Sequence, residues 1–137
     1  MELLSYILLP IEGTYYSEIK YNNMKTTGVV VGSFQPPILE MMDLIGTAVK
    51  ECDNVVVLIG SHQDLTRNKP YSYSHRKHII SVTYPTVIVH GIFDYDTDKQ
   101  WSFVLDAIIS IYENPLLYGF KKSYLNVYCG EHKCKRI

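Results

Sequence analysis

Glycines and small polar residues stand at or near the ends of several apolar runs, and this pattern is suited to binding phosphate. The segments that show it are Gly32-Ser33-Phe34-Gln35, Gly60-Ser61, Gly91-Ile92-Phe93-Asp94 and Cys129-Gly130-Glu131. Glycine lets a ligand's phosphates approach the backbone, because it has no Cβ. The same glycines could instead only turn the chain, and both interpretations remain open.

The runs that precede these segments predict the elements that must position them. Four buried parallel strands are predicted, over 28–32, 55–59, 86–89 and 125–128. Three helices are predicted, over 38–51, 73–82 and 99–112. Such alternation favours βαβ units, so we expect an α/β fold with a Rossmann-like parallel sheet and helices on both faces. Ligands of such sheets bind beyond the carboxyl ends of the strands.

Composition and charge restrict the class of protein. The chain has 137 residues, 47% hydrophobic and 20% charged, which fits one folded domain. Its formal net charge of -1 gives no reason to expect nucleic acid or an anionic membrane as a partner. Three cysteines without a signal-peptide pattern indicate a reducing, cytoplasmic setting. No apolar stretch approaches the roughly 20 residues that span a bilayer.

Residues 1–24 differ from the rest of the chain. They are rich in Tyr, Ile and Leu, contain Pro10 and Gly13, and could form a hairpin or arm ahead of an α/β domain over 25–137. The chain has 12 tyrosines, a residue type that is enriched at interfaces. A protein partner, or self-association through the arm, is therefore expected.

Several segments in order resemble a known enzyme family. Gly32-Ser33-Phe34-Gln35-Pro36-Pro37 is similar to the opening G-[RST]-F-[DQ]-P-x-H-x-G-H motif of a nucleotidyltransferase superfamily. Further segments resemble the nicotinamide mononucleotide (NMN) adenylyltransferases: 57–63 their second strand, 69–76 their N-P-F-[ST]-x-x-E-R, 93–101 their D-Y-x-x-[ND]-x-x-W and 127–133 their G-H-x-K segment. The resemblance covers about 26–133 and implies a nucleotidyltransferase fold.

The resemblance also implies a site and its ligands. Family members join a mononucleotide to the α-phosphate of ATP, so Mg²⁺ and ATP are implied for an active protein, and NMN or NAD as a bound ligand. Trp101 corresponds to a tryptophan on which the nicotinamide ring stacks, although a role in the core is equally open. The residues implied in nucleotide binding are Gly32, Ser33, Phe34, Gln35, Gly60, Ser61, Arg76, Asp94, Tyr95, Trp101, Gly130 and Lys133.

The residues that supply the family's phosphate donors are missing. The H-x-G-H positions read Ile38-Leu39-Glu40-Met41, so both histidines are replaced by apolar residues. Loss of one preorganised donor typically lowers the rate about 10²–10³-fold. A carboxylate about 4 Å from phosphate, at an effective dielectric constant of about 20, adds roughly 4 kcal/mol of repulsion. We therefore expect a catalytically degenerate relative.

Two further departures support that expectation. The family's acidic residue before the arginine is His75 here, and no I-S-x-T-x-[IV]-R segment follows the last predicted strand. Degenerate copies of this kind are conceivable in viral genomes, which makes a virus-infected host cell one expected setting.

Other interpretations of single residues remain. His62, His75 or His132 could replace the lost donors, which would make the chain an active adenylyltransferase. A pure interaction module without a ligand is a third possibility. No metal site is expected, because Cys129, His132 and Cys134 lack a fourth ligand. Asp94, Asp96 and Asp98 alternate in one predicted loop and could hold Mg²⁺ weakly, although a role in turns and helix capping is favoured.

Overall fold

Five strands form one parallel sheet in the order β3-β2-β1-β4-β5. The computed structural model describes residues 25–60 and 70–137, so the predicted arm over 1–24 lies outside the described residues. The strands are β1 (Thr27–Gly32), β2 (Asn54–Gly60), β3 (Ile88–Ile92), β4 (Pro115–Gly119) and β5 (Lys133–Arg136).

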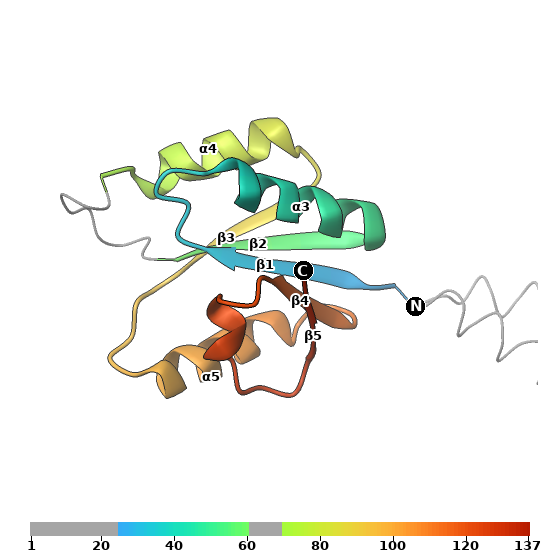
Figure 1. Cartoon of the computed structure of the whole chain (residues 1–137), viewed down its shortest axis with the longest axis vertical. Coiled ribbons are helices and arrows are strands. Elements are labelled where there is room, and N and C mark those ends of the chain that lie inside the picture. The colour runs from blue at the N-terminus through green and yellow to red at the C-terminus, as the bar shows by residue number, and fades with distance from the viewer. Residues whose placement is uncertain (1–24, 61–69) are drawn as a thin grey trace, which may run out of the picture.

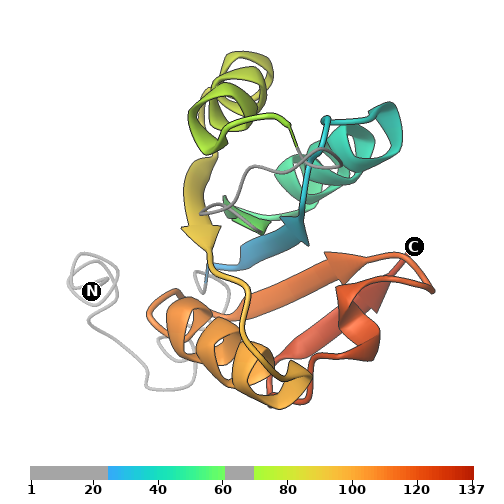
Figure 2. The ribbon, with the colours of Figure 1, turned by 90° about the vertical axis from the view of Figure 1, so that its left-hand side faces the viewer.

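Helices cover both faces of the sheet, as predicted (Figures 1 and 2). On one face lie α3 (Leu39–Glu51) and α4 (Tyr73–Thr83). On the other lie α5 (Asp98–Ile109) and a short 3₁₀ helix, η1 (Tyr124–Asn126). The expected Rossmann-like α/β fold is confirmed.

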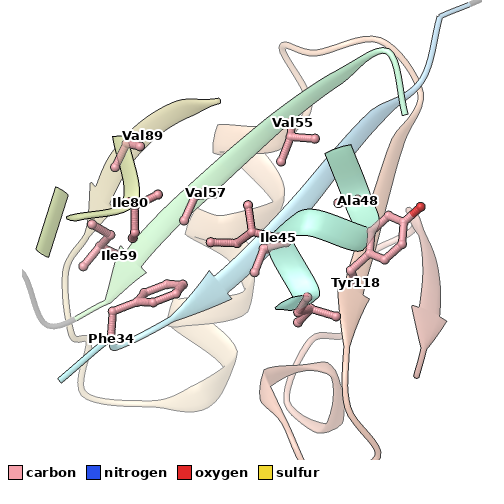
Figure 3. Packing of buried hydrophobic residues seen from close by; sticks show 11 residues of the cluster. Phe34, Ile45, Ala48, Val55, Val57, Ile59, Ile80, Val89 and Tyr118 are labelled. Atoms are coloured by element: carbon pink, nitrogen blue, oxygen red, sulfur yellow. The ribbon is translucent and has the colours of Figure 1, made fainter. Parts of the chain in front are cut away.

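Alternation of side chains along β1 builds the two halves of the core. Val30 packs toward α3, whereas Val29 and Val31 pack toward α5. Figure 3 shows the first half, in which Ile45 of α3 lies against the strands. Burial of each such side chain stabilises the fold by roughly 1.5–3 kcal/mol. The continuous β-branched run of β1 is thus explained by burial on both faces.

The predicted strand over 125–128 is wrong. Residues 124–126 form η1, because the Ser123 side chain accepts a hydrogen bond from the Leu125 N–H and begins a turn. The Leu125 side chain is then buried beneath the sheet. The strand beside β1 is β4 instead, and β5 follows η1. The third predicted strand is also displaced, because β3 starts at Ile88 and continues to Ile92.

The sheet order defines where a ligand can enter. From β1 the chain moves outward through β2 to β3, and it then returns to place β4 on the other side of β1. At such a reversal the connections leave the sheet in opposite directions, which opens a crevice at the carboxyl ends of the strands. In this protein the crevice lies beyond β1 and β4.

Candidate nucleotide site

A cavity of about 500 Å³ lies at this reversal. Its lining comes from β1 and the loop after it, from the amino end of α3, from the end of β2, from the loop after β3, from α5, from the loop after β4 and from η1. The lining residues are Val31, Gly32, Ser33, Phe34, Gln35, Pro36, Ile38, Met41, Gly60, Asp94, Trp101, Phe120, Lys122, Ser123 and Tyr124. Seven residues predicted from the sequence as nucleotide-binding are among them: Gly32, Ser33, Phe34, Gln35, Gly60, Asp94 and Trp101.

Gly32 and Phe34 form the floor of the cavity. A Cβ on Gly32 would lie 2.7 Å from Met41 Cε and 3.1 Å from Phe34 Cε2, so a side chain there would have to displace the end of Met41. Phe34 adopts a positive φ of 51°, and its ring is buried on the face of the sheet that α3 covers. Figure 3 shows the ring beside the carboxyl ends of β1 and β2. The close approach to Gly32 is therefore made by Met41 and Phe34.

The amino end of α3 offers no side-chain donor to the cavity. Ile38 occupies the N-cap position without a capping hydrogen bond and is 50% exposed. Leu39 is 75% exposed, and Met41 packs on Gly32. Glu40, in the first turn, lies near the positive end of the helix dipole. Because Glu40 is exposed, its repulsion of a phosphate at about 4 Å is closer to the 1 kcal/mol expected in water.

Arg76 stabilises the strand ends beneath the cavity. It is fully buried, with 0% exposure. Its Nη1 donates to the carbonyl oxygens of Ser33 (2.7 Å) and Gly60 (2.9 Å), and its Nε donates to that of Ser72 (3.2 Å). Burial lowers the pKa of Arg76 from its ordinary value. The side chain predicted to bind a nucleotide thus joins the ends of β1 and β2.

The Gln35 side chain is also hydrogen-bonded within the protein. Its Nε2 donates to the carbonyl oxygen of Tyr71 (2.8 Å), and the Tyr71 N–H donates to its Oε1 (2.9 Å). This pair joins the loop after β1 to the segment before α4. The side-chain amide of Gln35 therefore fixes the shape of the cavity wall.

Aromatic residues form the opposite wall. Trp101, in the first turns of α5, is half-buried and meets the Tyr124 ring edge-to-face at 6.3 Å between centroids. Asp94 and Tyr95 lie in the loop before α5 and line an adjoining hollow together with Trp101. Thr97, rather than an aspartate, caps the helix by accepting from the Gln100 N–H (3.1 Å). The flat Trp101 ring is placed where a planar ligand could contact it.

Two predicted residues lie elsewhere, because 125–128 is not a strand. Gly130 lies against Asp106 of α5 and Tyr128, which leave no room for a Cβ. Lys133 begins β5 and lines a different cavity, with Asn114 and Pro115 at the amino end of β4. The prediction that Gly130 follows a strand at the carboxyl edge of the sheet is therefore wrong, and Lys133 does not line the cavity beyond β1 and β4. Ser61 lies outside the described residues.

Four residues that line the cavity were not predicted from the sequence. Phe120, Lys122, Ser123 and Tyr124 follow β4 and complete the cavity. The signal that could have revealed them is Gly119, which ends an apolar run at 115–118 as Gly32 and Gly60 end theirs.

The predicted alternative donors have other contacts. His132 Nε2 lies 3.0 Å from Ser110 Oγ and 3.7 Å from Asp106 Oδ1, close to the carboxyl end of α5. His75 stacks on Tyr71, with 5.6 Å between ring centroids. Within residues 25–60 and 70–137, no three His, Cys, Asp or Glu side chains are grouped so that they could hold a metal ion. No helix in these same ranges has the length and apolar character needed to cross a membrane.

Solved structures share this fold. A bifunctional NMN adenylyltransferase/ADP ribose pyrophosphatase from Francisella tularensis is 20% identical at a TM-score of 0.68, and the match covers 83% of this chain and 38% of that one. The NadR protein, solved in complex with NAD and AMP-PNP, is 15% identical at a TM-score of 0.61, over 82% of this chain and 37% of that one. The chain thus has the fold of NMN adenylyltransferase-type nucleotidyltransferases, and it spans less than two fifths of the length of these two proteins.

A solved structure of a differently described protein also shares the fold. A lipopolysaccharide core biosynthesis protein from Thermoplasma volcanium is 16% identical at a TM-score of 0.53, with 82% of this chain and 96% of that one covered. No protein-family model matches the sequence. A comparison with curated protein sequences also finds no match.

Proposed function

We propose that this protein binds a nucleotide in the cavity beyond β1 and β4 without transferring adenylyl groups efficiently. The observation that carries the proposal is the amino end of α3. Adenylyl transfer depends on preorganised donors aimed at the charge that develops on the transferred phosphate. Here Ile38 and Met41 face the cavity with no polar atom to donate, and Glu40 adds a negative charge to the same turn.

Binding is supported by the shape and lining of the cavity. Its volume of about 500 Å³ falls within the range of small-molecule sites, which is roughly 300–1,000 Å³. Trp101 and Tyr124 offer aromatic surface, and the backbone around Gly32 lies at the floor. Two proteins of the same fold were solved with nucleotides, one with AMP and a manganese ion and one with NAD and AMP-PNP. NMN, NAD or another adenine nucleotide is accordingly the proposed ligand class.

The direct experiment separates binding from turnover. The full chain is incubated with ATP, Mg²⁺ and NMN, and NAD and pyrophosphate are measured against a buffer blank. We expect no product above the blank, together with a rise in melting temperature when NMN, NAD or AMP is added, since a ligand of the native state stabilises it by RT ln(1 + [L]/Kd). Sustained formation of NAD would refute the degenerate-enzyme proposal, and the absence of any thermal shift would refute nucleotide binding.

An active adenylyltransferase, with Mg²⁺ and ATP as cosubstrates, is the second candidate. Neither His75 nor His132 lines the cavity, which leaves His62, outside the described residues, as the remaining histidine of that hypothesis. If NAD forms, loss of activity in His62→Ala would support it. A protein partner, self-association through 1–24 and a cytoplasmic setting stay proposals that the sequence suggested.

A further inference from the structure

The loop between β4 and η1 brings a lysine to the cavity. Lys122 lines the cavity, and its side chain forms no hydrogen bond or ion pair with another described residue. The neighbouring Lys121 is also exposed but does not line the cavity. One of two adjacent lysines is therefore placed where a ligand would meet its ammonium group.

Hydrogen bonds from three side chains fix the backbone around Lys122. Arg136 Nη1 donates to the carbonyl oxygens of Lys121 (3.2 Å) and Phe120 (3.4 Å). Ser123 Oγ donates to the Phe120 carbonyl oxygen (2.7 Å), and the Tyr124 hydroxyl donates to that of Tyr118 (2.6 Å). A loop fixed in this way loses little conformational freedom when a ligand binds, which favours affinity.

The charges around the cavity are unevenly distributed. Of the described residues that line it, Lys122 is the cationic one and Asp94 the acidic one. The α3 side presents apolar Ile38 and Met41, and Glu40 already lies near the positive end of the helix dipole. An anionic ligand group therefore gains most at the β4 side, because hydrogen bonds between charged groups are stronger than neutral ones.

We propose that Lys122 binds the phosphate of a nucleoside monophosphate, so that the ligand's phosphate lies at the loop after β4 and not at the amino end of α3. This inference rests on the proposed function. A single ammonium group matches one phosphate group, so the site selects monophosphates over the corresponding nucleosides and gains little from a longer polyphosphate. The less polar part of the ligand then lies toward Ile38, Met41 and Trp101.

Calorimetric titration of the full chain tests the assignment with two ligand pairs, AMP against adenosine and NMN against nicotinamide riboside. We expect each monophosphate to bind about tenfold more tightly than its nucleoside, as one charge-assisted hydrogen bond provides. Lys122→Gln should abolish this preference while leaving nucleoside affinity unchanged. Lys121→Gln, a matched change one residue away, should retain it. Melting temperatures equal to that of the unmodified chain establish that both variants are folded.

The outcomes separate the two proposals. If Lys122→Gln keeps the preference for monophosphates, the phosphate lies elsewhere, and the Lys122 proposal is wrong although nucleotide binding stands. If both lysine variants lose the preference equally, diffuse surface charge explains it, and the proposal is again wrong. If none of the four ligands binds the unmodified chain, the proposed function fails together with it.

Discussion

Arg76, which the sequence predicts to bind a nucleotide, hydrogen-bonds to the backbone of the protein itself. Its guanidinium donates to carbonyl oxygens at the ends of two neighbouring strands, where parallel pairing stops and backbone groups need other partners. The loops after β1 and β2 are positioned by these bonds. The role of Arg76 in the site is therefore to shape it.

Replacement of Arg76 by Met should destabilise the fold strongly. The Ser33 and Gly60 carbonyl oxygens would lose charge-assisted hydrogen bonds at a buried position, so we expect a loss of roughly 3–5 kcal/mol in the free energy of unfolding. Urea denaturation measures it. Lys77→Met on the exposed side of α4 is the control and should cost under about 1 kcal/mol. Equal effects of the two changes would show that Arg76 does not hold the strand ends.

Trp101 should carry much of the ligand-dependent stabilisation. Removal of its ring takes away one wall of the cavity, so Trp101→Ala should abolish the rise in melting temperature that NMN causes in the unmodified chain. Phe103→Ala, on the same helix with a side chain 76% exposed, should leave that rise intact. An unchanged rise in Trp101→Ala would place the ligand elsewhere.

Glu51 should contribute stability that depends on pH. Hydrogen bonds from Lys135 and then Tyr118, each 2.7 Å, lower the pKa of the Glu51 carboxyl below its ordinary value of 4.5. A lowered pKa in the folded state adds stability above the ordinary pKa, and that stability is lost as the pH falls through the lowered value. The difference in unfolding free energy between the unmodified chain and Glu51→Gln should therefore shrink from about pH 7 to about pH 3. A pH-independent difference, or one that grows in acid, would contradict this assignment.

At the scale of elements, β4 and η1 depend on close contact at Gly119. A Cβ there would lie 2.7 Å from Ser123 Oγ and 2.8 Å from Leu125 Cδ1, so Gly119→Ala must push η1 away from the strand. We expect a cost of about 1–3 kcal/mol in the free energy of unfolding, measured with urea. Gly60→Ala is the control, because the nearest atom to its Cβ would be the Gly32 carbonyl oxygen at 3.7 Å. Comparable costs for the two changes would mean that the packing of η1 on Gly119 is not tight.

The same elements show what the sequence could and could not predict. The valine-rich runs of β1 and β2 are buried on both faces, so their composition alone identified them. By contrast, β4 begins with Pro115 and contains no β-branched residue, and the four residues of β5 are all exposed. Neither strand has the pattern of a buried parallel strand. Residues 125–128 resembled one more closely, although the Ser123 cap and the burial of Leu125 make a 3₁₀ turn there.

The site residues were predicted correctly where their strand was predicted, and missed where it was not. Residues after β1 and β2 were identified because their strands were, and the structure brings Gly32 and Gly60 into one cavity with Asp94 and Trp101. The residues after β4 were not predicted, because β4 itself was not predicted. Gly130 and Lys133 were predicted at that edge of the site instead. Gln35 and Arg76 bind backbone groups from distant parts of the chain. Spacing along the sequence does not reveal such tertiary contacts.

At the scale of the whole molecule, the order of strands creates the site, and no single motif does. Any chain that runs from β1 out to β3 and returns to β4 has a crevice at the reversal. In this chain the crevice has Gly32 at its floor, and the side chains at the first turn of α3 are apolar or acidic. The proposed binding function depends on this combination of an open crevice and a helix end without side-chain donors.

A crystal structure of the full chain with AMP would test the proposed binding mode most directly. The distances to compare are those from the phosphate oxygens to the backbone N–H groups of residues 39–41 and to Lys122 Nζ. We expect the phosphate within hydrogen-bonding distance of Lys122 and outside that distance from the amino end of α3. A phosphate bound by the backbone of residues 39–41 would show that the amino end of α3 binds phosphate and would contradict the proposed phosphate position at Lys122.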